Sequence, residues 1–177
     1  MILALALFAC TPDDVTDDAM DTASDADTDT DADTDTDTDT DTDTDTDIHA
    51  AWLSEGADIS ALFQASPFSF VRVDATFETD ASYAVVALDG EGAATNFAGT
   101  FVVDDSTRPG TITLTQSAPY AATAVGIYQV DGDTLSYEVV QTVPDYGFTP
   151  PTPETGFGTT AGPGVAAGAN LQIYQRQ

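Results

Sequence analysis

The chain has 177 residues and a formal net charge of −28, with 31 acidic residues, three arginines and no lysine. This charge excludes nucleic acid as a partner, because a phosphate backbone is bound through a basic patch. It favours a monomer through self-repulsion. The single cysteine permits no internal disulfide, so a folded domain must be held by its own core.

The first nine residues form an apolar run, MILALALFA, which is too short to span a bilayer at ~20 residues. A small residue, Ala9, directly precedes Cys10. Residues 7–10 resemble the lipobox of bacterial lipoproteins. This resemblance implies that residues 1–9 are a cleaved signal peptide and that lipid on Cys10 anchors the protein at the outer membrane or cell surface. The alternative is a buried amino-terminal strand or helix with an inert cysteine.

Residues 10–47 carry 17 acidic side chains and no basic one, mostly as an Asp-Thr repeat. Burial cannot offset the entropy of ordering such a segment, so we expect a disordered tether. Its charges lie roughly 7 Å apart when extended, within the ~8 Å Debye length, so they repel and expand it. Calcium loops also use alternating Asp, but they need a Gly and a closing Glu that this repeat lacks. Two other properties of the repeat are left as alternatives: loose condensation of divalent ions on its carboxylates, and O-glycosylation of its threonines.

From residue 48 onward, short strand-like runs alternate with turn residues. The runs predict strands over residues 68–77, 83–88, 99–103, 111–115, 124–130, 134–140 and 171–175. The clearest hairpin turns at Asp131-Gly132-Asp133, where glycine can adopt a positive φ. The one helix candidate covers residues 58–63.

Strands at this spacing, without long helices between them, predict an all-β domain over residues 48–177. We expect an antiparallel meander that is closed or nearly closed into a β-barrel, which removes exposed edges. Residues 144–168 are dense in Pro and Gly and form a long loop. Such a loop is often functional. The interpretation that we favour is a coil folded over the barrel mouth, whose aromatic residues hide core.

Four motifs occur in a characteristic order: Gly99-Thr-Phe-Val-Val-Asp104, Pro109-Gly-Thr-Ile112, Gly126-Ile-Tyr-Gln-Val-Asp-Gly-Asp-Thr-Leu135 and Tyr174-Gln-Arg176. The order resembles that of bacterial lipocalin-like domains, over residues 52–176. This resemblance implies that Trp52 packs beneath a lipocalin-like barrel against Arg176 of the final strand. Their cation–π contact would be structural rather than catalytic.

No catalytic, cofactor or metal site is predicted, and we expect no enzyme. His49, the only histidine, is interpreted as an exposed linker residue. Glu138 alternates with Tyr137 and Val139 and is expected to face solvent. Other acidic pairs are interpreted as turn residues or chance neighbours rather than calcium ligands or acid–base pairs: Asp131 and Asp133, Glu55 and Asp58, Asp104 and Asp105.

Two functions follow from a barrel of this kind. In the first, the barrel binds a small apolar ligand, lined by Phe70, Phe101, Tyr128, Tyr137, Phe148 and Phe157. In the second, the interior is filled and the protein is a structural or adhesive component of the envelope. The interior discriminates between them, since a cavity of ~300 Å³ or more favours a ligand and packed side chains favour the second function.

Overall fold

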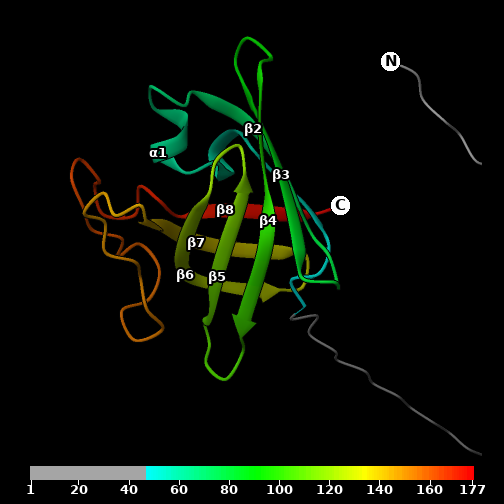
Figure 1. Cartoon of the computed structure of the whole chain (residues 1–177), viewed down its shortest axis with the longest axis vertical. Coiled ribbons are helices and arrows are strands. Elements are labelled where there is room, and N and C mark those ends of the chain that lie inside the picture. The colour runs from blue at the N-terminus through cyan, green and yellow to red at the C-terminus, as the bar shows by residue number, and fades with distance from the viewer. Residues whose placement is uncertain (1–46) are drawn as a thin grey trace, which may run out of the picture. The chain divides into compact units, whose positions relative to one another are not determined.

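The computed structural model describes residues 47–177, which form a closed eight-stranded barrel (Figure 1). Each strand pairs antiparallel with the next along the chain, and the first pairs with the last. The predicted all-β meander is therefore confirmed. The strands are β1 (Ala51–Glu55), β2 (Phe70–Phe77), β3 (Ser82–Asp89), β4 (Ala94–Asp104), β5 (Gly110–Ala118), β6 (Ala122–Asp131), β7 (Thr134–Val143) and β8 (Gln172–Arg176).

The strand that closes the barrel, β1, was not among the predicted strands. It has five residues, and only Trp52 and Ser54 are buried, so the apolar alternation is too short to stand out. It pairs with β2 along its length and with β8 through Trp52–Arg176 and Leu53–Gln175. Neighbouring strands on both sides therefore fix it.

The other strand predictions are close, and most observed strands are longer. The β4 strand begins five residues before its predicted start, because the alanines and Asn96 of Ala94–Ala98 weaken the strand signal there. In the region of the predicted helix 58–63, the structure has two shorter helices. A 3-10 helix covers Gly56–Asp58, and α1 covers Ala61–Gln64. Ser60 caps α1 by accepting the Phe63 N–H.

Two inward-facing glycines let neighbouring strands approach closely. A Cβ at Gly99 would lie 2.1 Å from the Thr115 carbonyl oxygen, and one at Gly126 would lie 2.0 Å from that of Glu138. A glycine with φ of +58° also makes the predicted two-residue turn between β6 and β7, at Gly132. In the Gly-Ile-Tyr motif, Gly126 thus allows close strand approach, and in the Asp-Gly-Asp motif, Gly132 makes the turn.

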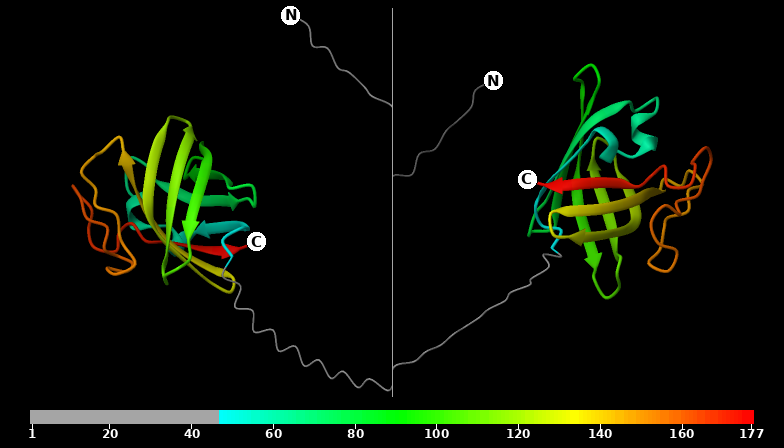
Figure 2. Two further views of the ribbon diagram at one scale, coloured as in Figure 1. Left: turned by 60° about the horizontal axis from the view of Figure 1, so that its bottom comes forward. Right: turned by 180° about the vertical axis from the view of Figure 1, so that it is seen from behind.

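The connection between β7 and β8, residues 144–171, lies outside the barrel next to β6 and β7 (orange in Figures 1 and 2). It contains an antiparallel bridge between Thr149 and Ala161. The Phe148 ring packs against Gly162, where an added Cβ would lie 2.3 Å from that ring. Within the described residues, no helix is long and apolar enough to cross a membrane.

Candidate functional site

The barrel end at which the described chain begins is closed by Trp52 and Arg176. The Arg176 guanidinium carbon lies 4.6 Å from the centroid of the Trp52 ring, and Trp52 is 1% exposed. The Trp52 indole N–H donates to the Ile48 carbonyl oxygen at 2.8 Å, and Arg176 Nη2 donates to that of Asp47 at 3.2 Å. The contact between Trp52 and Arg176 that the family resemblance implies is present, and both residues also hold the chain where it enters the barrel.

His49 belongs to this same barrel end. Its ring is half-buried and lies 5.6 Å from the Phe101 ring, between centroids, so the expectation of an exposed linker residue is wrong. The ring also pairs with the Asp47 carboxylate. Burial acts to raise the pKa of Asp47, but hydrogen bonds from His49 and the charge of Arg176 outweigh it, leaving the pKa below its usual value. We assign this cluster a structural role, because it fastens the chain entry.

The interior next to this end is crossed by aromatic side chains. The Phe77 ring centroid lies 5.1 Å from that of Phe101 and 6.2 Å from that of Tyr137. The Tyr137 ring in turn lies 6.1 Å from Tyr174. Because β1 and β8 separate β2 from β7 around the barrel, the contact between Phe77 and Tyr137 crosses its interior. Side chains therefore fill this part of the barrel.

Burial of phenol groups in this interior shifts their ionisation. It raises the pKa of Tyr83 to about 12 and raises the pKa of Tyr137 well above its usual value. Burial also raises the pKa of Tyr174, which the neighbouring Gln172 amide partly opposes. For Tyr128, burial and then the hydrogen bond to Asp105 raise the pKa. These phenols are neutral over the physiological range.

The six aromatic residues expected to line one cavity lie in four places. Phe101 and Tyr137 belong to the aromatic set that crosses the interior. Phe70 lies at the opposite barrel end, near α1, where its ring centroid is 6.1 Å from Phe63 and 5.7 Å from Phe68. Tyr128 is buried beside the β4–β5 turn. Phe148 and Phe157 belong to the outer loop and are half-buried there.

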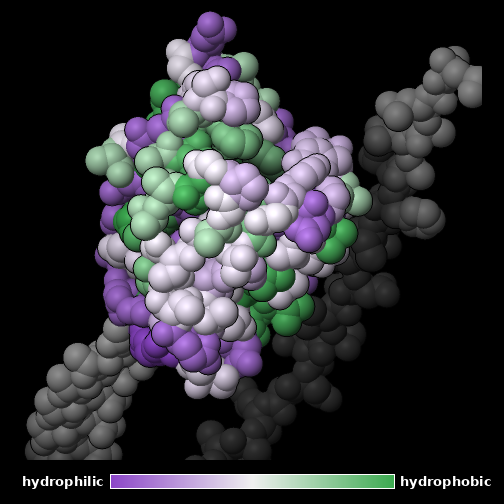
Figure 3. Space-filling model, turned by 90° about the vertical axis from the view of Figure 1, so that its left-hand side faces the viewer, coloured by the Kyte–Doolittle hydropathy of each residue, from purple (hydrophilic) through white to green (hydrophobic). Residues whose placement is uncertain are grey.

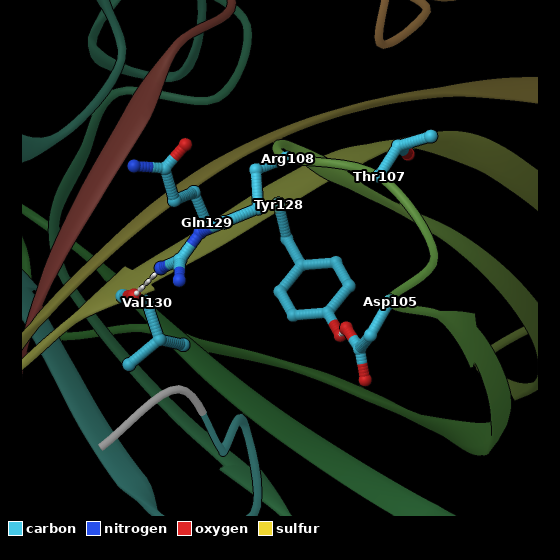
Figure 4. Close-up of a pocket in the computed structure, with 6 residues that line it drawn as sticks. All are labelled: Asp105, Thr107, Arg108, Tyr128, Gln129 and Val130. Atoms are coloured by element: carbon cyan, nitrogen blue, oxygen red, sulfur yellow. Dashed lines mark hydrogen bonds between the residues drawn. The ribbon is translucent and has the colours of Figure 1, made fainter. Parts of the chain in front are cut away.

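A small pocket of about 80 Å³ lies beside the β4–β5 turn, shown in Figure 4. The Tyr128 hydroxyl donates to the Asp105 carboxylate at one side of it. At the other side, Arg108 Nη2 donates to the Val130 carbonyl oxygen at 3.0 Å. The volume is well below the ~300 Å³ at which ligand pockets begin, and the polar groups already bind one another. The pocket is lined by Asp105, Thr107, Arg108, Tyr128, Gln129 and Val130.

The outer face of β6 and β7 holds the main polar site that the sequence did not predict. Glu138 is 0% exposed, so the expectation that it faces solvent is wrong. Its carboxylate accepts the backbone N–H groups of Gly158 and Thr160. Asn170 Nδ2 donates to the Val139 carbonyl oxygen at 2.8 Å, which holds the loop to the β7 edge. The sequence assigned Glu138 correctly to the outer face but did not show that a loop covers that face.

The loop accounts for further burial on this side of the molecule. Ile127 pairs with Glu138 and also faces outward, yet it is 0% exposed. Figure 3 shows this side, where apolar residues appear as small separate groups among hydrophilic and intermediate ones. Residues 144–171 therefore cover an apolar sheet face rather than the barrel mouth. Within the loop, Phe148 and Phe157 are half-buried and Tyr146 is 59% exposed.

Most acidic pairs named from the sequence have partners within the protein. Asp131 Oδ1 lies 3.4 Å from Arg108 Nη2, and Asp133 Oδ1 lies 3.8 Å from Arg176 Nε. Glu55 lies 3.9 Å from an Arg72 nitrogen. Between residues 47 and 177, no three His, Cys, Asp or Glu side chains are arranged to hold a metal ion. Each of the three arginines thus pairs with at least one acidic side chain of the described residues.

Some inward-facing residues toward the α1 end of the barrel are only partly buried. Three inward-facing residues there pack against the core but keep partial exposure: Val85, Phe97 and Val139. Ile59, just before α1, is 2% exposed and belongs to the core. Solvent therefore reaches part of the interior wall on the β3–β4 and β7 sides.

Comparisons of the chain with protein-family models, with curated proteins and with solved structures give no match in any of the three.

Proposed function

We propose that this protein is a lipid-anchored component of a bacterial cell envelope, in which an acidic tether carries a lipocalin-like barrel as a rigid, non-catalytic head. The head acts through its outer surface, in envelope structure or adhesion, and its interior holds no apolar ligand. The observation that carries this proposal is the contact between Phe77 and Tyr137, whose ring centroids lie 6.2 Å apart across the barrel.

Three further features support a head of this kind. The chain entry is fastened at one barrel end by Trp52 and Arg176, so a pull on the tether reaches the closed sheet. The Trp52–Arg176 contact and the strand order also support the lipocalin-like assignment. The domain from residue 48 has 14 acidic residues against three arginines, which favours solubility.

The anchor is proposed from the sequence around Cys10, which lies outside the described residues, as do nearly all of the tether residues 10–47. Metabolic labelling with a fatty-acid probe tests it. We expect label on the unmodified chain and none on Cys10→Ser. Equal labelling of both would contradict the anchor and leave the account of the barrel unaffected.

The filled interior is tested by titration with Nile red, an uncharged dye that fluoresces in apolar sites. We expect no saturable binding to the unmodified chain. Tyr137→Ala is the matched positive control, because removing a ring that crosses the barrel opens apolar space that can take a small ligand. Saturable binding to the unmodified chain would contradict the proposal.

A second function has one observation in its favour. The partial exposure of Val85, Phe97 and Val139 near α1 would suit a barrel that admits a small apolar ligand at that end. Substitution of Phe97 by Asp would abolish Nile red binding if this function held. Val102→Asp, on the outer face of the same strand and 72% exposed, is its matched control.

A further inference from the structure

The barrel interior near α1 contains two polar side chains on neighbouring strands. Ser54 of β1 is 0% exposed and Gln172 of β8 is 2% exposed. Continuing the β1–β8 register by one residue places Ser54 opposite Tyr174, two residues after Gln172. Ser54 and Gln172 are therefore diagonal neighbours, at a separation that a long side chain can span.

The orientation of the Gln172 amide is fixed by the backbone before α1. Its Oε1 accepts the Ser60 N–H at 3.2 Å, and the reverse orientation would place two donors against each other. Nε2 consequently points away from Ser60. The Gln172 amide lies close enough to the Tyr174 phenol to act on its pKa. Among residues 47–177, however, neither Gln172 Nε2 nor Ser54 Oγ has a partner at hydrogen-bond distance and angle.

Buried polar groups in folded proteins are nearly always hydrogen-bonded, to protein or to a bound molecule. Nε2 offers only donors, and the serine hydroxyl both donates and accepts. A group that satisfies both must have an oxygen with free lone pairs. No charged side chain is among the groups that define the site, so the group must be uncharged.

We propose that Ser54 and Gln172 form an interior binding site for one uncharged oxygen, that of a water molecule or of a hydroxyl or carbonyl group on a small ligand. The inference does not rest on the proposed function, because a site for one oxygen fits a filled barrel and a partly open one. The outcome of its experiment does not depend on whether Cys10 is lipidated or on whether the barrel binds Nile red.

A double-mutant cycle on the full-length chain tests the site, using Ser54→Ala, Gln172→Leu and the double variant. If an oxygen bridges the two side chains, Ser54→Ala lowers the folded-to-unfolded ratio roughly three- to tenfold. The loss is smaller in the Gln172→Leu background, because the bridge is already broken there. Gln172→Leu and the double variant both lose the hydrogen bond from the Ser60 N–H, so this loss cancels from the coupling energy.

Ser136→Ala, an outward-facing serine on β7, is the matched control and should change the ratio by no more than roughly twofold. If Ser54 is unpartnered, Ser54→Ala instead leaves the ratio unchanged or raises it, since the unpaired hydroxyl costs stability. That result would overturn the proposal.

Two measurements on the unmodified chain separate the sources of the oxygen and do not depend on every variant folding. Magnetic relaxation dispersion of water counts long-lived internal waters, and native mass spectrometry weighs a retained uncharged molecule. A water or a molecule that disappears in either single variant supports the site and identifies its occupant. If neither signal is present, or if neither responds to the substitutions, the proposal is wrong.

Discussion

Arg176 lies over the face of Trp52, with 4.6 Å between the guanidinium carbon and the ring centroid, and the two residues face each other across the seam between β8 and β1. The seam is the last contact of the meander, since it joins the two ends of the sheet. Because Arg176 Nη2 also donates to the Asp47 carbonyl oxygen, the same residues hold the chain where it enters the barrel. The residues that close the barrel therefore also hold its chain entry.

Substitution of this pair should show coupled losses of stability. Trp52→Ala leaves a cavity in a fully buried site and should lower the free energy of unfolding by ~3–5 kcal/mol. Arg176→Ala should cost less, and the coupling between them should be ~0.5–2 kcal/mol, the range of a cation–π contact. Denaturant unfolding of both single variants and the double variant measures it. Additive losses would show that the contact contributes nothing.

Glu138→Gln should release the outer loop while leaving the barrel closed. The amide offers one acceptor where the carboxylate offers two, so the N–H of Gly158 or Thr160 loses its partner. We expect the free energy of unfolding to fall by ~1–3 kcal/mol and hydrogen exchange at residues 157–161 to become faster. Glu154→Gln, an exposed change in the same loop, is the control. Unchanged exchange in Glu138→Gln would contradict the role of the carboxylate.

The buried phenols should make the domain sensitive to alkali. A group whose pKa is raised in the folded state stabilises the fold fully below its unfolded pKa of about 10. That contribution is lost as the pH rises through the folded value, which is about 12 for Tyr83. The free energy of unfolding should therefore fall between about pH 10 and about pH 12.

Tyr83→Phe isolates one phenol in this fall. The ring stays in place and the ionising hydroxyl is removed, so the loss of stability between about pH 10 and about pH 12 should shrink relative to the unmodified chain. Tyr146→Phe, at a residue that is 59% exposed, is the control. An equal pH dependence in all three proteins would show that the Tyr83 phenol does not couple to folding.

The sequence predicted the barrel well because seven of its strands carry their own alternation and turn signals. The strand β1 was missed because its five residues are specified by pairing with β2 and β8, which is a tertiary effect. Glu138 was misplaced for a related reason. Strand periodicity separates the two faces of a sheet, but it does not show that a distant loop covers one of them.

The interior could be predicted less well than the fold. Aromatic residues such as Phe101, Tyr137 and Phe157 look alike in a sequence, because burial in a core, in a cavity wall and under a loop all favour them. Their sorting into separate places depends on how the barrel closes. The Trp52–Arg176 pair was predicted only through the resemblance to lipocalin-like domains, which implies this contact.

The central claim is that side chains fill the barrel by contact between β2 and β7. A double-mutant cycle of Phe77→Leu and Tyr137→Leu tests it most directly, with the free energy of unfolding as the readout. The account predicts a coupling of ~0.5–1.5 kcal/mol between the two rings, the range of a packed aromatic pair. Fully additive losses would mean that the rings do not meet across the interior, and would contradict a filled barrel.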